Sequence, residues 1–168
     1  EVDLFRGICS GGETATRIFG GHVIAQALMA AYRTVPDRLC HSLHAYFIRP
    51  GDPSIPVIYS VDRARDGGSF TTRRVVAIQH GKQILNMSTS FHAGEDGWEH
   101  QHPMPDVTPP DGLPSRSELR AASAAHVPEK RRKDFLRPRP IEIREVEPQD
   151  LFAPIPMDDT NHMWFRMR

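Results

Sequence analysis

The pattern of hydrophobic and polar positions changes along the chain from that of a helix to that of strands. Residues 21–32 are almost all small or apolar, which predicts a helix buried on most of its faces. Residues 40–48, 56–65, 69–80 and 83–92 have the alternation or the β-branched composition of strands, although the first of them alternates imperfectly. A helix followed by successive antiparallel strands predicts an α+β fold, in which a curved sheet wraps around a buried helix.

Turn-forming residues lie between the predicted strands. Asp66-Gly67-Gly68 is a strong signal for a hairpin, and His80-Gly81 marks the turn between the last two strands. Under period-two counting, one face of the first strand carries His41, Leu43, Ala45 and Phe47.

The composition changes sharply after residue 94. Five prolines between Pro103 and Pro114 predict a linker. Ser115 and Glu118 then form the pattern of a capping box, which predicts a short helix that continues through residue 125.

The last part of the chain returns to a strand pattern. Residues 141–146 alternate, and residues 161–168 form another strand-like run with no turn or cap after it. We therefore expect a first unit at residues 1–94, a linker with a short helix at residues 95–139, and the first strands of an incomplete second unit at residues 140–168.

Charge and composition argue against several classes of partner. The 168 residues carry 21 Lys plus Arg and 21 Asp plus Glu, so no net charge favours nucleic acid or a membrane surface. No apolar run approaches the about 20 residues that a membrane span needs, and the first residues do not resemble a secretory signal. Cys9 and Cys40 form no Cys-x-x-Cys pair, which favours a reducing compartment and thiols that are buried as small apolar side chains.

Two glycines, Gly20 and Gly21, directly precede the apolar run of the predicted helix. The start of a helix presents unpaired backbone N–H groups and a dipole, which together favour negative charge. Glycine would let a developing oxyanion come close to these donors. Small residues equally permit tight packing of a helix against a sheet, so two interpretations are open.

Histidines supply the other candidate chemistry. His41 lies early in a predicted strand, where it could act as a general base near neutral pH, although we favour a structural, hydrogen-bonded role. His44 lies three residues further on and should face the opposite side of the strand, so we do not expect the two to share a metal. His100 and His102 lie in a proline-rich stretch without a further cluster of ligands, and we expect no metal site there.

Arginine and lysine residues raise two further questions. Arg73 and Arg74 are adjacent on a predicted strand and should point to opposite faces, so at most one of them can face a ligand. Residues 129–139 form a basic run, which we interpret as a solvated surface, with a contact for phosphate groups as the alternative.

Several ordered motifs resemble a known family. They are Ile18-Phe-Gly-Gly-His-Val-Ile-Ala-Gln-Ala-Leu28, His41-Ser-Leu-His-Ala-Tyr-Phe-Ile-Arg-Pro-Gly-Asp52, Arg65-Asp-Gly-Gly-Ser-Phe70 and Trp98-Glu-His-Gln-His-Pro-Met-Pro105. In this order and spacing they resemble the first repeat of acyl-CoA thioesterase II, and the resemblance covers nearly the whole chain. It departs from the family at His22 and His92, where relatives commonly carry Gln.

The resemblance implies a double hotdog, two repeats in each of which an antiparallel sheet enfolds a long central helix. It also implies hydrolysis of fatty acyl-CoA to free acid and CoA, without a cofactor. Family members orient the attacking water with an Asp, a Ser or Thr, and a Gln, all of which lie in the second repeat, and no position of this chain matches them. We therefore expect the chain to be inactive by itself. Because no Gly-x-Ser-x-Gly motif is present, we expect water rather than a side chain to be the nucleophile.

The same resemblance implies a set of site residues. The expected substrate-binding residues are Gly20, Gly21, His22, Asp66, Gly67, Gly68, Ser69 and Phe70. His41 is the candidate catalytic residue in this chain. Because the family places its catalysis in the other repeat, we favour tight packing as the reason for Gly20 and Gly21.

The expected partners are acyl-CoA and the second hotdog repeat, since a lone hotdog would expose a sheet edge and an apolar helix end. We further expect a homo-oligomer, in the cytoplasm or, in a eukaryote, the peroxisome. Two other functions stay open: a non-catalytic acyl-CoA binding module, and a single-hotdog homodimer such as a dehydratase.

Overall fold

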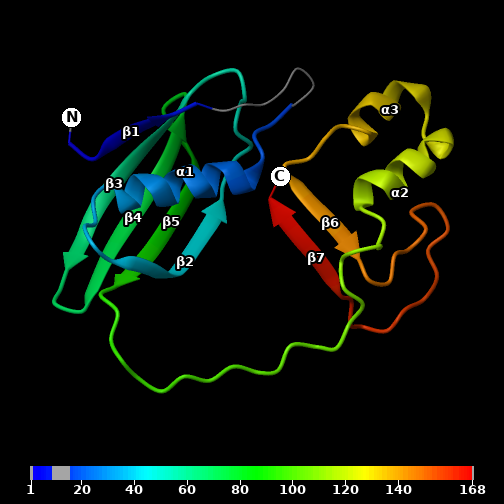
Figure 1. Ribbon diagram of the computed structural model, residues 1–168. Coiled ribbons are helices and arrows are strands. Elements are labelled where there is room, and N and C mark those ends of the chain that lie inside the picture. Colours follow the sequence, from blue (N-terminus) through cyan, green and yellow to red (C-terminus); the bar gives the residue numbers. More distant parts are fainter. Residues whose placement is uncertain (1, 9–15, 168) are drawn as a thin grey trace. The chain divides into compact units, whose positions relative to one another are not determined.

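The computed structural model describes residues 2–8 and 16–167 of the chain (Figure 1). They separate into two units, one within Glu1–Glu99 and one within His100–Arg168, and each is described by itself. Cys9, for which the sequence predicts a buried thiol, lies outside the described residues, as does Arg168 at the end of a predicted strand.

The first unit is a five-stranded antiparallel sheet with one helix lying across it (Figure 1). Its elements are β1 (Leu4–Gly7), α1 (Gly20–Tyr32), β2 (Leu39–Phe47), β3 (Val57–Asp66), β4 (Phe70–Gln79) and β5 (Lys82–His92). The order in the sheet is β1-β3-β4-β5-β2, which places β1 and β2 at the edges. The predicted helix and four strands are confirmed to within one residue at each end, whereas the sequence pattern predicts no element at β1.

The buried face of α1 explains why this segment forms a helix against a sheet. Val23, Ala27, Ala30 and Ala31 recur at helical spacing and are buried in the core of this unit. Because three of the four are alanines, the helix backbone can come close to the strands. The predicted burial fails on one side of the helix. Met29 is 56% exposed and lies on the same stripe of the helix as the exposed residues 21 and 25.

Two tight turns join the last three strands, as predicted. His80 and Gly81 connect β4 to β5 and both have positive φ, 48° and 69°, as a two-residue turn of type I′ requires. Residues 67–69 connect β3 to β4, and the amide of Gly67 donates to the carbonyl of Phe70 at 2.9 Å.

The second unit combines short helices with a two-stranded antiparallel sheet. Its elements are α2 (Arg116–Ala122), the 3-10 turn η1 (Ala124–His126), α3 (Glu129–Phe135), β6 (Ile141–Glu145) and β7 (Met163–Met167). The predicted capping box is present: the hydroxyl of Ser115 accepts from the amide of Glu118 at 3.2 Å, and Glu118 Oε2 accepts from the amide of Ser115 at 2.6 Å. The helix ends at Ala122, three residues before its predicted end, because η1 takes over.

The two faces of the β6–β7 sheet differ in polarity. Glu142 is buried on one face and accepts from Arg144 at 2.8 Å and from Arg166 at 3.3 Å. The opposite face of β7 carries Phe165, which is 74% exposed, together with the exposed residues 163 and 167. A two-stranded sheet is only marginally stable by itself, and this face of β7 leaves its apolar side chains exposed.

Candidate functional site

The first group of predicted site residues lies at the start of α1. Phe19, the N-cap, provides no side-chain hydrogen bond to the first amides of the helix. A Cβ on Gly20 would lie 2.7 Å from the ring of Phe47, the last residue of β2, so the helix and the strand meet closely here. The atoms nearest to a Cβ on Gly21 would be those of the ring of Phe19. Close packing therefore accounts for Gly20, as favoured from the sequence.

His22 belongs to a polar connection between α1 and its neighbouring strands. Its Nε2 lies 3.3 Å from the carbonyl oxygen of Ile8, to which Gln26 Nε2 also donates at 2.9 Å. Gln26 Oε1 in turn accepts from the hydroxyl of buried Tyr59 at 2.8 Å. A Cβ on Gly7 would lie 2.2 Å from the side-chain oxygen of Gln26, so glycine is needed where β1 passes the helix.

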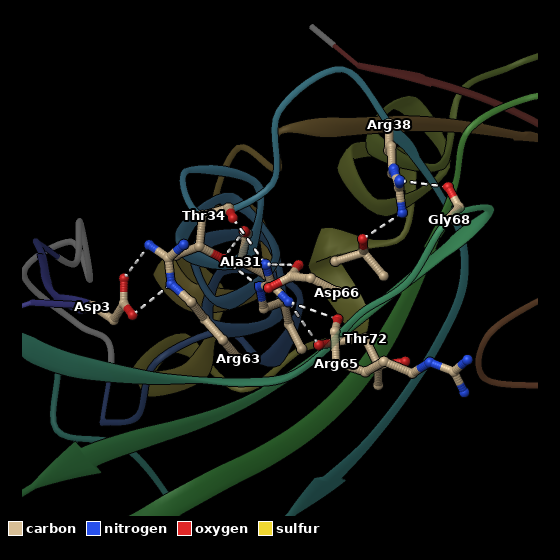
Figure 2. Close-up of polar contacts among 11 residues, drawn as sticks. Asp3, Ala31, Thr34, Arg38, Arg63, Arg65, Asp66, Gly68 and Thr72 are labelled. Carbon is tan, nitrogen blue, oxygen red and sulfur yellow. Dashed lines mark hydrogen bonds and ion pairs between the residues drawn. The ribbon is translucent and has the colours of Figure 1, made fainter.

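A buried arginine occupies the other end of α1, where Figure 2 shows its partners. Arg73 on β4 is 1% exposed. It donates to the hydroxyl of Thr34 at 2.8 Å, to three carbonyls, those of Thr34, Arg65 and Thr72, at 3.0 Å each, and to Asp66 Oδ1 at 2.6 Å. These contacts use all of the five N–H donors that a guanidinium has.

Because all the N–H donors of Arg73 are used in hydrogen bonds, its role can be assigned. Arg74 is exposed on the opposite face of β4, so the prediction that the two arginines point apart is confirmed. Because every donor of Arg73 is already bonded within the protein, this side chain joins the segment just after α1 to β3 and β4 and does not face a ligand.

The predicted Asp-Gly-Gly hairpin is held at the same end of the unit (Figure 2). Asp66 forms the ion pair with Arg73, while its side chain stays 58% exposed. Arg38, from the loop after α1, donates to the carbonyl of Gly68 and to the hydroxyl of Thr71, both at 2.6 Å. The hairpin is thus fixed by two arginines, one of which had no predicted role.

A register shift in β2 changes the direction of its histidines. The shift falls between Cys40 and Ser42, which makes His41 the additional residue of a bulge. Cys40 and Leu43 both pack against the core, so Ser42 and His44 lie on the outer face of the sheet, the face opposite α1. A bulge has no local sequence signal here, and strict alternation therefore fails.

His41 also lies on the outer face, and two expectations about it are wrong. Its Nε2 is 2.8 Å from the hydroxyl of Ser90, and its ring lies 6.0 Å from that of His92 and 5.6 Å from that of Phe70. His41 therefore does not lie on the core face with residues 43, 45 and 47. It lies on the same face of the sheet as His44, not on the opposite one. It is a hydrogen-bonded residue of the sheet surface in this unit.

The predicted site residues thus fall into two groups at opposite ends of α1. Gly20, Gly21 and His22 lie where the helix starts. The hairpin at residues 66–70 lies where it ends, since Arg73 joins Asp66 to Thr34 just beyond the helix. A helix of 13 residues is about 20 Å long, so the first unit does not bring the two groups together.

Comparison with known proteins identifies the family. Residues 11–92 match the family of the acyl-CoA thioesterase N-terminal domain. Acyl-CoA thioesterase 2 of Haemophilus influenzae is 38% identical over 151 residues, which are 89% of this chain and 53% of that protein. The solved structure of acyl-CoA thioesterase II TesB2 from Mycobacterium marinum is 41% identical, with a TM-score of 0.72 over 100% of this chain and 56% of its own. This chain belongs to the acyl-CoA thioesterase II family.

The fold of this thioesterase II chain is the predicted hotdog. A hot dog fold protein of unknown function from Alicyclobacillus acidocaldarius is 23% identical and has a TM-score of 0.72 over 98% of this chain and 57% of its own. The chain spans about half the length of the relatives it matches. That coverage agrees with the first half of a double hotdog.

The described part of the thioesterase II chain contains neither a metal-binding cluster nor a membrane-spanning helix. Within residues 2–8 and 16–167, no group of three or more His, Cys, Asp or Glu side chains could hold a metal ion. None of the helices in the described part of the chain has the length and apolar character needed to traverse a bilayer. The rings of His100 and His102 contact each other at 5.0 Å.

The basic run of the chain forms α3 and the segment after it. Arg132 donates to the carbonyls of Ala124 and Val127 at 3.2 Å each and so closes the end of η1. Residues 130, 131 and 133 are exposed. This arrangement fits the solvated surface that the sequence favours.

Sequence reasoning missed the polar residues that hold the two groups in place. Gln26, Thr34 and Arg38 each connect segments that are distant along the chain. A polar residue within an otherwise apolar helix was a usable signal for Gln26. Thr34 and Arg38 offered no such signal, because the partners that make them important, Arg73 for Thr34 and the hairpin residues for Arg38, lie 30 or more residues away.

Proposed function

We propose that the protein hydrolyses fatty acyl-CoA thioesters to free fatty acid and CoA, with an activated water as nucleophile. The observation that carries the proposal is the 41% identity, over the whole chain, with an acyl-CoA thioesterase II of the same fold. In this proposal the chain supplies the first hotdog and the opening strands of the second. The Asp, the Ser or Thr, and the Gln that orient the water belong to the second hotdog.

The position of β2 supports a site completed by a second hotdog. β2 is an edge strand, and an edge presents backbone groups that can pair with another strand. The start of α1 lies at the end of β2, where Gly20 meets Phe47, and the end of α1 lies at the start of β2, where the Tyr32 hydroxyl accepts from the amide of Cys40 at 2.8 Å. The helix therefore runs opposite to the edge strand.

If β2 pairs antiparallel with the corresponding strand of the second hotdog, the arrangement of the two helices follows. The start of each β2 strand comes to lie beside the end of the other, so the start of one helix comes near the hairpin end of the other hotdog. We infer that each acyl-CoA site takes its helix start from one hotdog and its hairpin from the other. This accounts for two groups of site residues that one hotdog alone keeps about 20 Å apart.

The hydrolysis is tested by incubating the full-length protein with palmitoyl-CoA and measuring the thiol that is released. We expect turnover, and we expect quenched reactions to contain no covalent acyl adduct. Thermal stabilisation by CoA esters without any thiol release would instead identify a binding module, and a trapped acyl-protein would contradict water as the nucleophile.

We further propose a homo-oligomer in the cytoplasm, or in the peroxisome of a eukaryote. Cys40 is a free thiol, which is consistent with a reducing compartment. The uncovered stripe of α1 around Met29 and the edge of β2 supply surfaces through which hotdogs associate.

A further inference from the structure

Arg38 connects the segment before β2 to the β3–β4 hairpin. Asp37, with a φ of 52°, turns the chain in the left-handed region after α1, and Arg38 follows it, directly before β2 begins at Leu39. The guanidinium of Arg38 donates from Nη1 to the hydroxyl of Thr71 and from Nη2 to the carbonyl of Gly68, each at 2.6 Å (Figure 2). One planar group thus holds both the turn and the strand that leaves it.

The tip of the hairpin depends on hydrogen bonds for its position. Gly68 is exposed, and a Cβ on it would meet nothing within 4 Å among the described residues, so packing does not hold it. Two adjacent glycines also leave the backbone of a turn free to adopt many conformations. From outside the turn, Arg38 bonds to the carbonyl of Gly68, and the amide of Ala93 donates to the carbonyl of Ser69 at 3.1 Å. We therefore expect Arg38 to determine where the tip of the turn lies.

Arg38 differs from Arg73, the other arginine that holds the hairpin. Arg73 is buried and also fixes the segment just after α1 through Thr34, so its loss should destabilise the whole unit. Arg38 is only partly buried, and both of its bonds go to the hairpin. The loss of Arg38 should therefore release the hairpin while the core of the unit stays in place.

We propose that Arg38 is a positioning residue for acyl-CoA, because it holds the Gly67–Gly68 turn in the place where the turn contacts the substrate. The inference rests on the proposed function, in which the hairpin of one hotdog and the helix start of the other form each site. Arg38 directly precedes β2, the edge strand with which the second hotdog pairs in that proposal. The two bonds of Arg38 therefore fix the hairpin relative to this edge strand.

Hydrogen exchange in the full-length protein tests whether Arg38 holds the turn. The amide of Gly67 reports on the turn, because it donates to the carbonyl of Phe70 at 2.9 Å. In Arg38→Ala this amide should exchange at least about tenfold faster, which is the factor that the loss of a charged hydrogen bond predicts. Arg74→Ala is the matched control, because it removes the same charge from the outer face of β4, and it should leave the exchange unchanged.

Steady-state hydrolysis of palmitoyl-CoA by the full-length protein tests whether the position of the turn matters to the substrate. Arg38→Ala should raise KM at least about tenfold and keep kcat within about threefold, because in this account the water-activating residues belong to the second hotdog. Thr71→Val removes one acceptor of Arg38 and should also raise KM, and the double variant should be no worse than Arg38→Ala, since both remove one connection. Arg38→Lys keeps the charge but loses the planar fork, so it should not restore the wild-type KM. Arg74→Ala should leave KM unchanged.

Several results would overturn the proposal: unchanged exchange at Gly67 or an unchanged KM in Arg38→Ala, an equal rise of KM in Arg74→Ala, or a wild-type KM in Arg38→Lys. A fall in kcat as large as the rise in KM, together with a lower melting temperature, would show a role in the fold alone and overturn it too. The hydrolysis fails separately, if the wild-type protein releases no thiol. Palmitoyl-CoA then stays intact and can be titrated by calorimetry: Arg38→Ala should bind it at least about tenfold more weakly than the wild type, and equal binding would contradict the positioning role.

Discussion

Arg73 and Thr34 join β4 to the segment just beyond α1 through two hydrogen bonds, from Nε to the hydroxyl at 2.8 Å and from Nη2 to the carbonyl at 3.0 Å. Thr34 in turn donates from its hydroxyl to the carbonyl of Ala31 at 2.8 Å. One arginine therefore fixes the end of the helix, while its remaining donors hold the hairpin that begins at Asp66.

Replacing Arg73 by Ala should lower the free energy of unfolding by about 3 kcal/mol, because it leaves buried acceptors without partners. Urea denaturation measures the change. Arg74→Ala, on the exposed face of the same strand, should stay within about 0.5 kcal/mol of the wild type. Equal and small effects of the two substitutions would show that the network around Arg73 does not stabilise the fold.

Gly7→Ala should destabilise the protein because the new Cβ would meet the side chains of Gln26, at 2.2 Å, and Tyr59, at 2.8 Å. Displacing Gln26 also breaks its bond to the carbonyl of Ile8. We expect a loss of about 1–3 kcal/mol in urea denaturation. Gly97→Ala is the control, since its Cβ would meet nothing within 4 Å; a loss as large there would rule out the close contact as the cause.

The capping box predicts a pH dependence in the second unit. Hydrogen bonds from the hydroxyl and the amide of Ser115 hold the pKa of Glu118 below its ordinary value of 4.5. Because the folded pKa is the lower one, the stabilisation is present above pH 4.5 and is lost as the pH falls through the folded pKa.

An NMR titration of the Glu118 carboxylate measures this pKa directly. Ser115→Ala should raise the pKa toward 4.5, because both the hydroxyl donor and the N-cap are lost. A pKa of Glu118 that is the same in the variant and in the wild type would contradict the role of the hydroxyl.

His41 should not be the general base. Its side chain bonds to Ser90 on the face of the sheet opposite α1, so His41→Gln should keep the rate of palmitoyl-CoA hydrolysis by the full-length protein within about threefold, whereas the loss of a general base costs about 100-fold or more. Steady-state kinetics with an unchanged pH profile would agree with this. A 100-fold fall in kcat would return His41 to the catalytic set.

The elements that were predicted from sequence owe their signals to neighbours along the chain. The alanine-rich run of α1, the turn at His80-Gly81 and the capping box at Ser115 are each specified within a few residues. β1 was missed because four residues offer too little alternation for a pattern. The features that position the candidate site depend on distant residues.

Two examples show why the site was harder to predict than the fold. The bulge at His41 follows from the register of β2 against β5, which begins more than 40 residues later, so counting along one strand put the histidine on the wrong face. Arg38 and its acceptor Gly68 are 30 residues apart, and only the folded hairpin brings them to 2.6 Å. Local patterns predict elements, but they do not predict which polar groups meet.

The central claim is that these 168 residues form the supporting half of a thioesterase whose water-activating residues lie in a second hotdog. The most direct test is to measure thiol release from palmitoyl-CoA by the purified 168-residue chain and by the full-length protein under the same conditions. We predict turnover by the full-length protein and none by the shorter chain. Hydrolysis by the shorter chain at the rate of the full-length protein would contradict the claim.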